Sequence, residues 1–447
     1  MYHHSRILLA ISLVAIAPSS VWASGFALQN QTGSGNGNAF AGAAAAAEDA
    51  GTVFFNPAGM TLLGEGDNLS LAGTLIDRSI KFTDKGSSAN TTALGQIAPL
   101  PSADNGGDAG TLSLVPAGYW AHALNNQLWL GIGVSPTFGN KTEYDFNFVG
   151  RNAGYYADMQ QININPSLAY KLNEQISLGF GIDIAHNMTH FKQGYPITAA
   201  PNVNACAPLP TCAALNSANN YADIKGDAWG YGFNLGAMYA LSPATRLALT
   251  YRSQIKFDLE GKYDANSPVA GGAVFGDHDI KATLKTPDSA SLALSQKLSD
   301  QLELLADATW TGWSIVDTIK VTDKNTGATI TSLSYNFKDT WRYGIGANYQ
   351  YNDQWKLRAG LAYDQAPVKS AEDRTMTLPD SDRTWLSFGA RYTLSKASSI
   401  DMGYTHLFFK NASTARAVTT SLGTVETIRG DIKTSADLFS LQYNQKF

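Results

Sequence analysis

Residues 341–349 read Trp-Arg-Tyr-Gly-Ile-Gly-Ala-Asn-Tyr, and this stretch decides the fold. Aromatic or aliphatic residues occupy every odd position, and arginine, glycine or asparagine occupies every even position. A period of two residues indicates a β-strand whose two faces meet different surroundings. The apolar face carries an aromatic residue at each end, which is typical of strands that cross a membrane between two aromatic girdles. We therefore predict that the apolar face contacts lipid and that the polar face points into a lumen.

The same alternation recurs along the chain from Asn68 onward. It is present in residues 161–172, 176–185, 229–240 and 355–363. The last such segment ends at Phe447, and a terminal aromatic residue that closes an amphipathic strand resembles the assembly signal of outer-membrane barrels.

Short and long connections alternate between these segments. Short turns are predicted at Asn125-Asn126, Asn173-Glu174, Ser242-Pro243, Ser299-Asp300, Asn352-Asp353 and Ser395-Lys396. Long polar segments are predicted near residues 83–109, 140–159, 188–225, 261–278, 321–335, 366–381 and 411–431. Six short turns and seven long loops join fourteen strands, and an even strand number with short periplasmic turns is typical of outer-membrane barrels. The prediction is an all-β membrane protein, a fourteen-stranded antiparallel transmembrane β-barrel over residues 68–447 with both termini in the periplasm.

The composition agrees with a barrel. Charged residues make up 15% of the 447 residues, against about 25% in a soluble domain. After the N-terminus no stretch has the roughly 18 consecutive apolar residues that a membrane helix needs. The formal net charge of -5 speaks against a nucleic-acid partner.

The N-terminus has the pattern of a secretion signal. His3, His4 and Arg6 precede an apolar run over residues 7–17, and small or short residues stand at positions 21 and 23. Cleavage after Ala23 is expected, so residues 1–23 are predicted to be a signal peptide. The protein is then exported to an oxidising compartment, where Cys206 and Cys212, six residues apart in a polar, proline-rich segment, are candidates for a local disulfide.

Residues 24–67 differ from the strands that follow. Gly33, Gly35 and Gly37 predict a flexible turn, and the alanine-rich run from Ala39 to Ala47 predicts a helix. Asn56-Pro57-Ala58 predicts a helix start, with Asn as the N-cap and Pro at the first helical position, and the helix continues to Leu63. A compact segment of this kind must hang in the periplasm or fill the lumen. Its apolar, small-residue composition favours a plug (hatch) in the lumen.

These stretches resemble a known family. Gly25-Phe26-Ala27-Leu28-Gln29, Glu48-Asp49-Ala50 and Asn56-Pro57-Ala58-Gly59-Met60 are similar to the N-terminal plug of the FadL long-chain fatty acid transporters. Trp310-Thr311-Gly312-Trp313-Ser314 and Leu378-Pro379-Asp380-Ser381-Asp382-Arg383 extend the resemblance downstream, so that it covers nearly the whole mature chain. The family also includes importers of aromatic hydrocarbons.

The resemblance implies outer-membrane uptake of long-chain fatty acids by passive, ligand-gated diffusion. A ligand adheres to a groove of outer loops, passes to a pocket at the N-terminus of the plug, and leaves sideways where the third strand kinks. The implied partners are a fatty acid or another hydrophobic small molecule, together with outer-membrane lipid and lipopolysaccharide. Detergent is expected to occupy the pocket in vitro, the protein is expected to be a monomer, and no cofactor is implied.

Candidate exit and ligand residues follow from this picture. Ser135, Pro136 and Gly139 in the third strand are candidates for the lateral exit, because proline removes a ladder donor. The alternative is a strand end at the outer rim. Candidate ligand contacts are Phe26 at the mature N-terminus and the aromatic residues Phe138, Phe146, Phe148 and Tyr155. The loop aromatics have the alternative role of packing loop on loop.

The alternation also places charged residues inside the barrel. Arg252, Arg342, Arg358 and Arg383 are candidates either for a structural network or for holding a carboxylate head group. Asn56, Pro57, Ala58, Asp307 and Asp364 are candidates for anchoring the plug. Because an arginine offers a partner that a neutral hydrocarbon does not need, a fatty acid is favoured over an aromatic hydrocarbon.

Other functions find little support in the sequence. No Gly-x-Ser-x-Gly element is present, and the histidines lack metal-ligand spacing, so neither an enzyme nor a metal site is predicted. A general aqueous porin is the alternative from another class, and it would need an open lumen without a plug.

Overall fold

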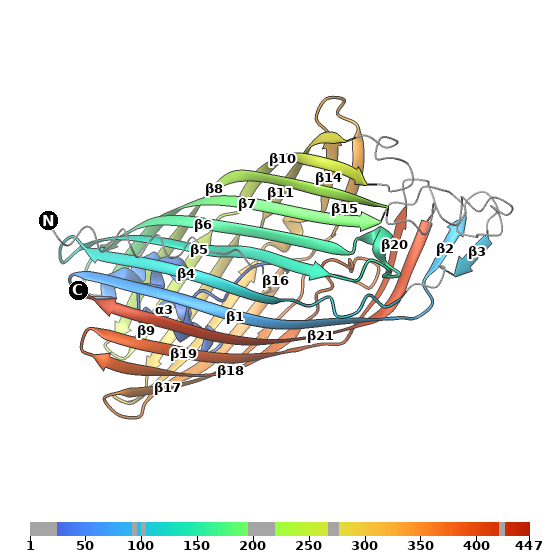
Figure 1. The fold of residues 1–447 in the computed structure, drawn as a ribbon. Helices are drawn as coiled ribbons and strands as arrows, with labels where there is room; N and C mark the ends of the chain where they lie inside the picture. The colour runs from blue at the N-terminus through green and yellow to red at the C-terminus, as the bar shows by residue number, and fades with distance from the viewer. Residues whose placement is uncertain (1–24, 92–95, 100–103, 195–219, 267–276, 420–424) are drawn as a thin grey trace.

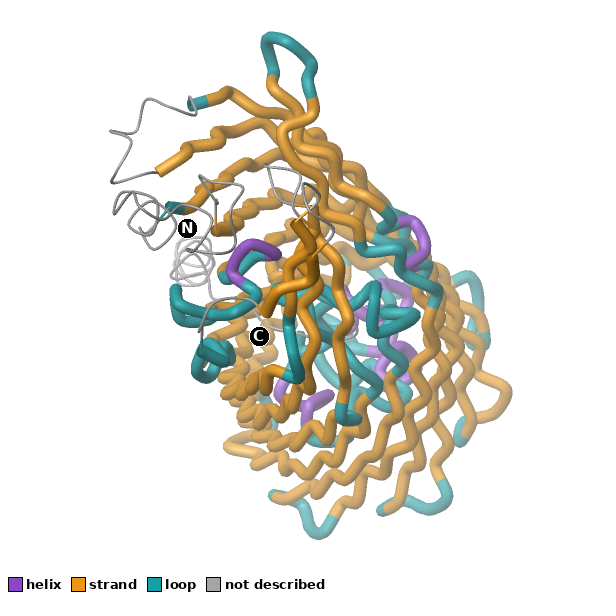
Figure 2. Tube along the Cα trace, turned by 90° about the vertical axis from the view of Figure 1, so that its right-hand side faces the viewer, coloured by secondary structure: helices purple, strands orange, loops and turns teal. Residues whose placement is uncertain are grey.

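The computed structural model describes residues 25–91, 96–99, 104–194, 220–266, 277–419 and 425–447. They form a closed antiparallel β-barrel with the N-terminal segment inside it (Figures 1 and 2). β1 pairs with both β4 and β21, which closes the sheet. The predicted signal peptide and the predicted disulfide between Cys206 and Cys212 lie outside the described residues.

Fourteen wall strands follow one another around the barrel, and five of them consist of two consecutive segments. In order they are β1 (Asp67–Asp84), β4 (Leu112–Ala123), β5 (Leu128–Glu143), β6 (Tyr156–Lys171), β7 (Ile176–Gly194), β8 (Tyr221–Ser242), β9 with β10 (Thr245–Arg252, Ile255–Asn266), β11 with β12 (His278–Thr286, Ser289–Lys297), β13 with β14 (Leu302–Thr311, Thr318–Asp323), β15 with β16 (Thr329–Ser334, Thr340–Gln350), β17 (Trp355–Asp364), β18 (Arg383–Ser395), β19 with β20 (Ser398–Phe409, Ala412–Thr419) and β21 (Val425–Lys446). A further hairpin of β2 (Ser88–Thr91) and β3 (Gln96–Pro99) pairs with β21. The predicted fourteen-stranded barrel is thus confirmed.

The segment before β1 fills the lumen, and we call residues 25–66 the plug. It contains α2 (Gly33–Asn36), α3 (Ala43–Ala46), α4 (Thr52–Phe55) and the 3-10 helix η1 (Pro57–Leu62). Two more 3-10 turns lie outside the plug. η2 (Arg151–Ala153) lies in the connection between β5 and β6, and η4 (Trp313–Ile315) lies between the segments β13 and β14 of one wall strand. Within the described residues, no helix is long and apolar enough to cross a membrane.

The plug helices differ in part from the prediction. Asn56 caps η1 by accepting a hydrogen bond from the Ala58 N–H, as its position before Pro57 predicts. The predicted continuous helix over residues 39–47 is wrong, because Ala39, Phe40 and Ala47 adopt positive φ angles of 55°, 56° and 47°. The turn predicted at the glycines is instead the short helix α2, capped by the Thr32 side chain. Close packing against the wall overrides the helix propensity of alanine here.

Inward-facing glycines make room for the plug. A Cβ atom on Gly360 would lie 2.1 Å from the carbonyl oxygen of Asn38, and one on Gly179 would lie 2.3 Å from the Ala58 nitrogen. Both distances are shorter than any non-bonded contact, so only glycine lets the plug backbone lie directly on the strands.

The strands extend farther outward than predicted. β7 runs to Gly194 and β8 starts at Tyr221, although residues 188–194 and 221–225 belong to a predicted loop. The alternation continues in these extensions, but the two faces exchange polarity. On β7 the apolar Phe180 and Ile182 face outward, whereas farther along Phe191 is buried inside and Lys192 faces outward. On β10 Phe257 and Leu259 are buried, while Lys256 and Asp258 face water.

Candidate ligand-binding site and lateral gap

The N-terminal strand of the plug lies along the exposed edge of β5. Leu28 N–H donates to the Thr137 carbonyl at 2.9 Å, and Gly139 N–H donates to the Phe26 carbonyl at 2.8 Å. Among the described residues, β4 pairs with β5 over Gly118–Ala123, so the β5 segment from Ser135 onward has no ladder to β4. Proline has no N–H to donate, and the register to β6 shifts between Pro136 and Phe138. The plug strand therefore occupies the place that β4 leaves.

Gln31 of the plug spans the gap between β4 and β5. Its Nε2 donates to the Pro136 carbonyl at 2.7 Å, and its Oε1 accepts from the Tyr119 hydroxyl of β4 at 2.8 Å. One buried side chain thus joins the paired part of β4 to the part of β5 that has no ladder to β4.

Three aromatic rings hold the tip of the plug, and we call them the clamp. Phe26 packs edge-on against Phe138 of β5 and Trp313 of η4, with ring centroids 5.8 Å and 4.7 Å away. Next to them, the Gly25 N–H donates to a carboxylate oxygen of Asp380 at 2.9 Å. Burial raises the pKa of Asp380 to about 6, although the Arg383 guanidinium and the Gly25 N–H act in the opposite direction.

An apolar cavity of about 870 Å³, partly open to solvent, lies above the clamp. Residues of eight wall strands (β5, β6, β7, β8, β10, β11, β14 and β15), of the plug and of the loop before β18 surround it. The apolar ones are Phe26, Met159, Phe191, Ile224, Leu259, Ile280, Leu284, Ile319, Val321, Leu333 and Leu378. The cavity is apolar because the strands exchange polarity at this height. Its apolar lining suits a small hydrophobic ligand.

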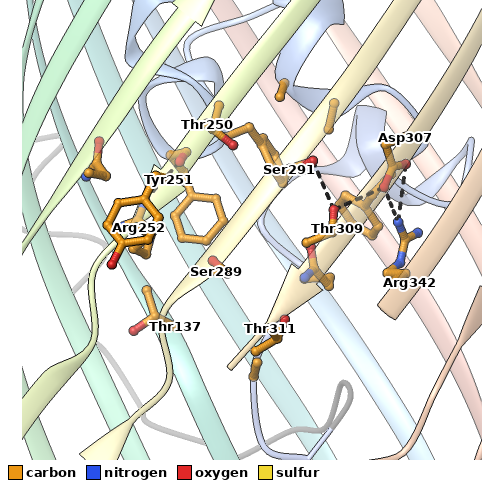
Figure 3. Close-up of a pocket in the computed structure, with 18 of the residues that line it drawn as sticks. Thr137, Thr250, Tyr251, Arg252, Ser289, Ser291, Asp307, Thr309, Thr311 and Arg342 are labelled. Atoms are coloured by element: carbon orange, nitrogen blue, oxygen red, sulfur yellow. Dashed lines mark hydrogen bonds and ion pairs between the residues drawn. The ribbon is translucent and has the colours of Figure 1, made fainter. Parts of the chain in front are cut away.

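A second cavity, of about 930 Å³ and also partly open to solvent, is shown with its lining residues in Figure 3. Ala27, Leu28 and Phe138 line it next to the clamp. Its barrel side carries the hydroxyl groups of Thr250, Ser289, Ser291, Thr309 and Thr311. We call it the hydroxyl cavity.

The four candidate arginines are all ion-paired. Arg252 contacts Asp183, and Arg342 contacts Asp307 at 3.0 Å. Arg383 pairs with Asp364 at 3.0 Å and with Asp380 at 3.3 Å. Arg252 and Arg342 line the hydroxyl cavity, whereas Arg358 and Arg383 line neither cavity. The argument that inward arginines favour a carboxylate ligand therefore loses its basis.

Glu48 joins the plug to the wall through several cations. Its carboxylate lies 2.7 Å from Arg358, 3.3 Å from Lys356 and 3.5 Å from Arg391. Burial alone would raise the pKa of Glu48, but these three cations outweigh it and hold the pKa well below its ordinary value. Arg358 also binds Asp401 at 2.6 Å, so that carboxylates of plug and barrel share one guanidinium.

The candidate anchoring residues take different places. Asn56 donates to the Ala44 carbonyl at 2.9 Å and to the Ala237 carbonyl of β8 at 3.4 Å, and Pro57 and Ala58 lie over Gly179. Asp307 accepts from the Gly42 N–H of the plug at 3.2 Å. Asp364 instead faces Arg383, and both stand where the loop between β17 and β18 begins and ends.

The loop aromatics gather near the outer rim, away from both cavities. Phe148 is fully buried and stacks on Tyr144 with centroids 4.1 Å apart, and Phe146 packs against Tyr155 at 5.3 Å. Both contacts lie within the connection between β5 and β6, and none of these side chains lines either cavity.

Sequence reasoning found Phe26 and Phe138 but missed Gln31, Trp313 and Asp380. Trp313 and Asp380 lie in the stretches 310–314 and 378–383 that resemble the family. The resemblance marked these stretches but did not indicate what the two side chains do. Their contacts join segments that are far apart in the chain, and no local pattern contains that information.

The comparisons with known proteins agree with this architecture. A family model described as "Outer membrane protein transport protein (OMPP1/FadL/TodX)" matches residues 14–447. The long-chain fatty acid transport protein of Salmonella typhi is 30% identical over 88% of this chain and 89% of its own, and that of Escherichia coli K12 is 28% identical over 91% and 92%.

Solved structures give the same picture. The crystal structure of a Pseudomonas aeruginosa FadL homologue is 26% identical with a TM-score of 0.83, and the match covers 95% of this chain and 100% of that chain. The Pseudomonas putida toluene transporter TodX, 20% identical with a TM-score of 0.66 over 89% and 94%, shares the fold. The chain therefore belongs to the OMPP1/FadL/TodX family of outer membrane transport proteins, and its barrel lies in the bacterial outer membrane.

Proposed function

We propose that this protein takes up long-chain fatty acids by passive diffusion through the plugged barrel. The observation that carries the proposal is the position of Phe26, which lines the base of the apolar cavity and belongs to the strand that covers the gap between β4 and β5. A ligand in the cavity thus touches the element that blocks its way out. The curated relatives named long-chain fatty acid transport proteins support the choice of substrate.

The binding energy of the ligand drives the opening. Burial of a methylene group contributes about 0.8 kcal/mol, so several methylenes against the apolar lining outweigh the contacts of one aromatic ring. The N-terminal strand is held by two backbone hydrogen bonds and by Gln31, each worth about 0.5–1.5 kcal/mol. When Phe26 is displaced, this strand leaves β5 and the gap opens toward the lipid. The acyl chain then passes from one apolar environment to another without meeting water.

A reversible covalent lock tests this step. Ala27 and Phe138 are bridge partners in an antiparallel arrangement, where Cα distances suit a disulfide. We expect Ala27→Cys/Phe138→Cys, in a Cys206→Ser/Cys212→Ser background, to lose oleate uptake when oxidised and to regain it after reduction.

Each single cysteine variant serves as the control, because it carries the same loss of side chain without the lock. Undiminished uptake by the oxidised double variant would show that the N-terminal strand need not leave β5. In that case the gap between β4 and β5 is not the exit.

The neutral aromatic hydrocarbon remains the second candidate substrate, because the arginines that favoured a carboxylate are ion-paired and the apolar cavity is rich in aliphatic side chains. Growth of a deletion strain on oleate and on toluene separates the two. We expect growth on oleate to fail and growth on toluene to persist. The reverse result would assign the hydrocarbon.

The same proposal fixes the surroundings of the barrel. β1 begins and β21 ends at the end that carries the short turns, so we place both termini in the periplasm (Figure 1). The closed sheet needs no second copy, which agrees with a monomer in contact with outer-membrane lipid and lipopolysaccharide. Detergent competes for the apolar cavity during purification.

A plug in contact with many wall strands speaks against a porin, and we expect no large steady current in planar bilayers.

A further inference from the structure

The hydroxyl cavity has two chemically different sides. The plug contributes an apolar side formed by Leu28, Phe40, Ala43, Phe54 and Phe55. The barrel contributes a polar side in which neighbouring strands carry hydroxyl groups at matching heights, with Ser289 opposite Thr311 and Ser291 opposite Thr309 (Figure 3). Such a cavity suits an amphiphile, with its chain along the plug and its head group on the wall.

The polar side carries no unbalanced charge. Arg252 and Arg342 stand at its two ends, and each is neutralised by an aspartate, Asp183 and Asp307 respectively. An ionised carboxylate would lose its hydration here without gaining a cation of its own. A neutral head group that donates and accepts hydrogen bonds loses much less.

Hydroxyl groups on the polar side can form hydrogen bonds with such a ligand. The Thr309 hydroxyl lies 2.9 Å from Ser291 and 3.2 Å from the Asp307 carboxylate, so Ser291 already belongs to a hydrogen-bonded group. Within the described part of the chain, the hydroxyls of Ser289 and Thr311 make no hydrogen bond, and both face the cavity. Two donors and several acceptors thus lie side by side, which matches the one donor and two acceptors of a protonated carboxyl group.

We propose that the hydroxyl cavity binds the head group of the transported acid in its uncharged, protonated form. This inference rests on the proposed function. Phe26 lines the apolar cavity, and the next residues, Ala27 and Leu28, line the hydroxyl cavity together with Phe138. When the clamp opens, the two cavities become continuous. The protonated acid is also the form that enters lipid at the lowest cost, because no charge has to be desolvated.

Three ligands of equal chain length test the inference on the full-length protein in lipid nanodiscs. Dodecanoic acid and dodecanol carry a hydrogen-bonding head group, and dodecane does not. We expect Ser289→Ala/Ser291→Ala/Thr311→Val to bind the acid and the alcohol about tenfold to thirtyfold more weakly and dodecane as tightly as the wild type. Thr283→Val, which removes a hydroxyl from the outer face of β11, is the control and leaves all three affinities unchanged.

The outcomes separate this inference from the proposed function. If the variant binds the acid more weakly but the alcohol as tightly as the wild type, the site recognises an ionised head group, and the inference is overturned. An equal loss for all three ligands, or no loss, would overturn it as well, because the hydroxyls would then shape the cavity or play no part. If the wild-type protein binds none of the three, the proposed function itself fails.

Discussion

At the scale of single residues, charged groups inside the barrel hold the plug in place. Glu48 is the central one, because three cations of two neighbouring strands converge on its carboxylate. Removal of one partner from a buried ion pair costs about 3–5 kcal/mol, since the remaining charge is left without a counter-ion. The side chain therefore secures the plug against the wall.

We expect Glu48→Gln to loosen the plug by a few kcal/mol, because it removes the carboxylate on which Arg358, Lys356 and Arg391 converge and leaves Arg358 with Asp401 alone. Ion conductance in planar bilayers measures the effect, and brief openings should appear that the wild type lacks. Glu65→Gln, at an exposed position beyond η1, is the matched control. If Glu48→Gln shows no more openings than the wild type, apolar packing alone retains the plug.

Asp380 makes the clamp sensitive to pH. Its pKa is raised to about 6 in the folded protein, above its ordinary value, because burial favours the uncharged form. Its contribution to clamp stability is thus fully present below about pH 4 and is lost as the pH rises through about 6. We expect protection of the Phe26 and Leu28 amides from hydrogen exchange, corrected for the intrinsic rate, to fall across this range by an equivalent of ~1–3 kcal/mol.

Asp380→Asn should abolish this dependence, since the amide keeps an acceptor for the Gly25 N–H but does not titrate. Asp382→Asn, in the same loop, should retain it. If protection in the wild type is independent of pH, the local opening does not involve Asp380.

Only some of these side-chain interactions can be predicted from the sequence. The alternation correctly places Arg342 and Arg358 inside the barrel, but it does not identify their partners. Asp307 is 35 positions from Arg342, and Glu48 is 310 positions from Arg358. Which carboxylate reaches which guanidinium depends on strand register and on the path of the plug, so candidate head-group ligands could not be told from structural pairs.

At the scale of elements, the plug and the wall strands fit one another through glycines. η1 lies on β7 because Gly179 has no side chain, and α2 approaches β18 at Gly389 for the same reason. Sequence reasoning placed glycines on the inward face of a wall strand, as in residues 341–349. It did not anticipate the positive φ angles of Ala39 and Phe40, because those follow from the shape of the space and not from local preference.

A side chain at Gly179 should displace η1. We expect Gly179→Val to destabilise the seated plug by ~2–4 kcal/mol through overpacking, with faster proteolytic cleavage of the plug from the periplasmic side. Gly73→Ala, on β1 where the added Cβ would meet only one atom at an ordinary 3.7 Å, is the control. Equal cleavage rates in the two variants would contradict the close packing of η1 against Gly179.

At the scale of the whole molecule, the barrel is much taller than the membrane is thick. A strand of 19 residues, such as β7, spans about 60 Å along its axis, whereas the lipid-facing band of an outer-membrane barrel is about 25 Å tall. The sequence pattern showed fourteen strands and the lipid-facing side. It missed the extensions, because a charged outer face with an apolar inner face was interpreted as loop.

Two lysine substitutions locate the boundary between the two zones. We expect Ile345→Lys, on the lipid-facing side of β16, to destabilise the barrel by ~2–4 kcal/mol in urea unfolding. Asp258→Lys, on the outer face of β10, should change the free energy of unfolding by less than about 1 kcal/mol. Equal penalties would mean that β10 is also immersed in hydrocarbon.

The exchange of polarity along the strands has a consequence for how an oily molecule arrives. In the proposed uptake route, an apolar lining that begins outside the lipid-facing band removes water from the solute before the solute reaches the hydrocarbon. Dehydration of the solute and its passage through the membrane are then separate steps at different heights of the barrel.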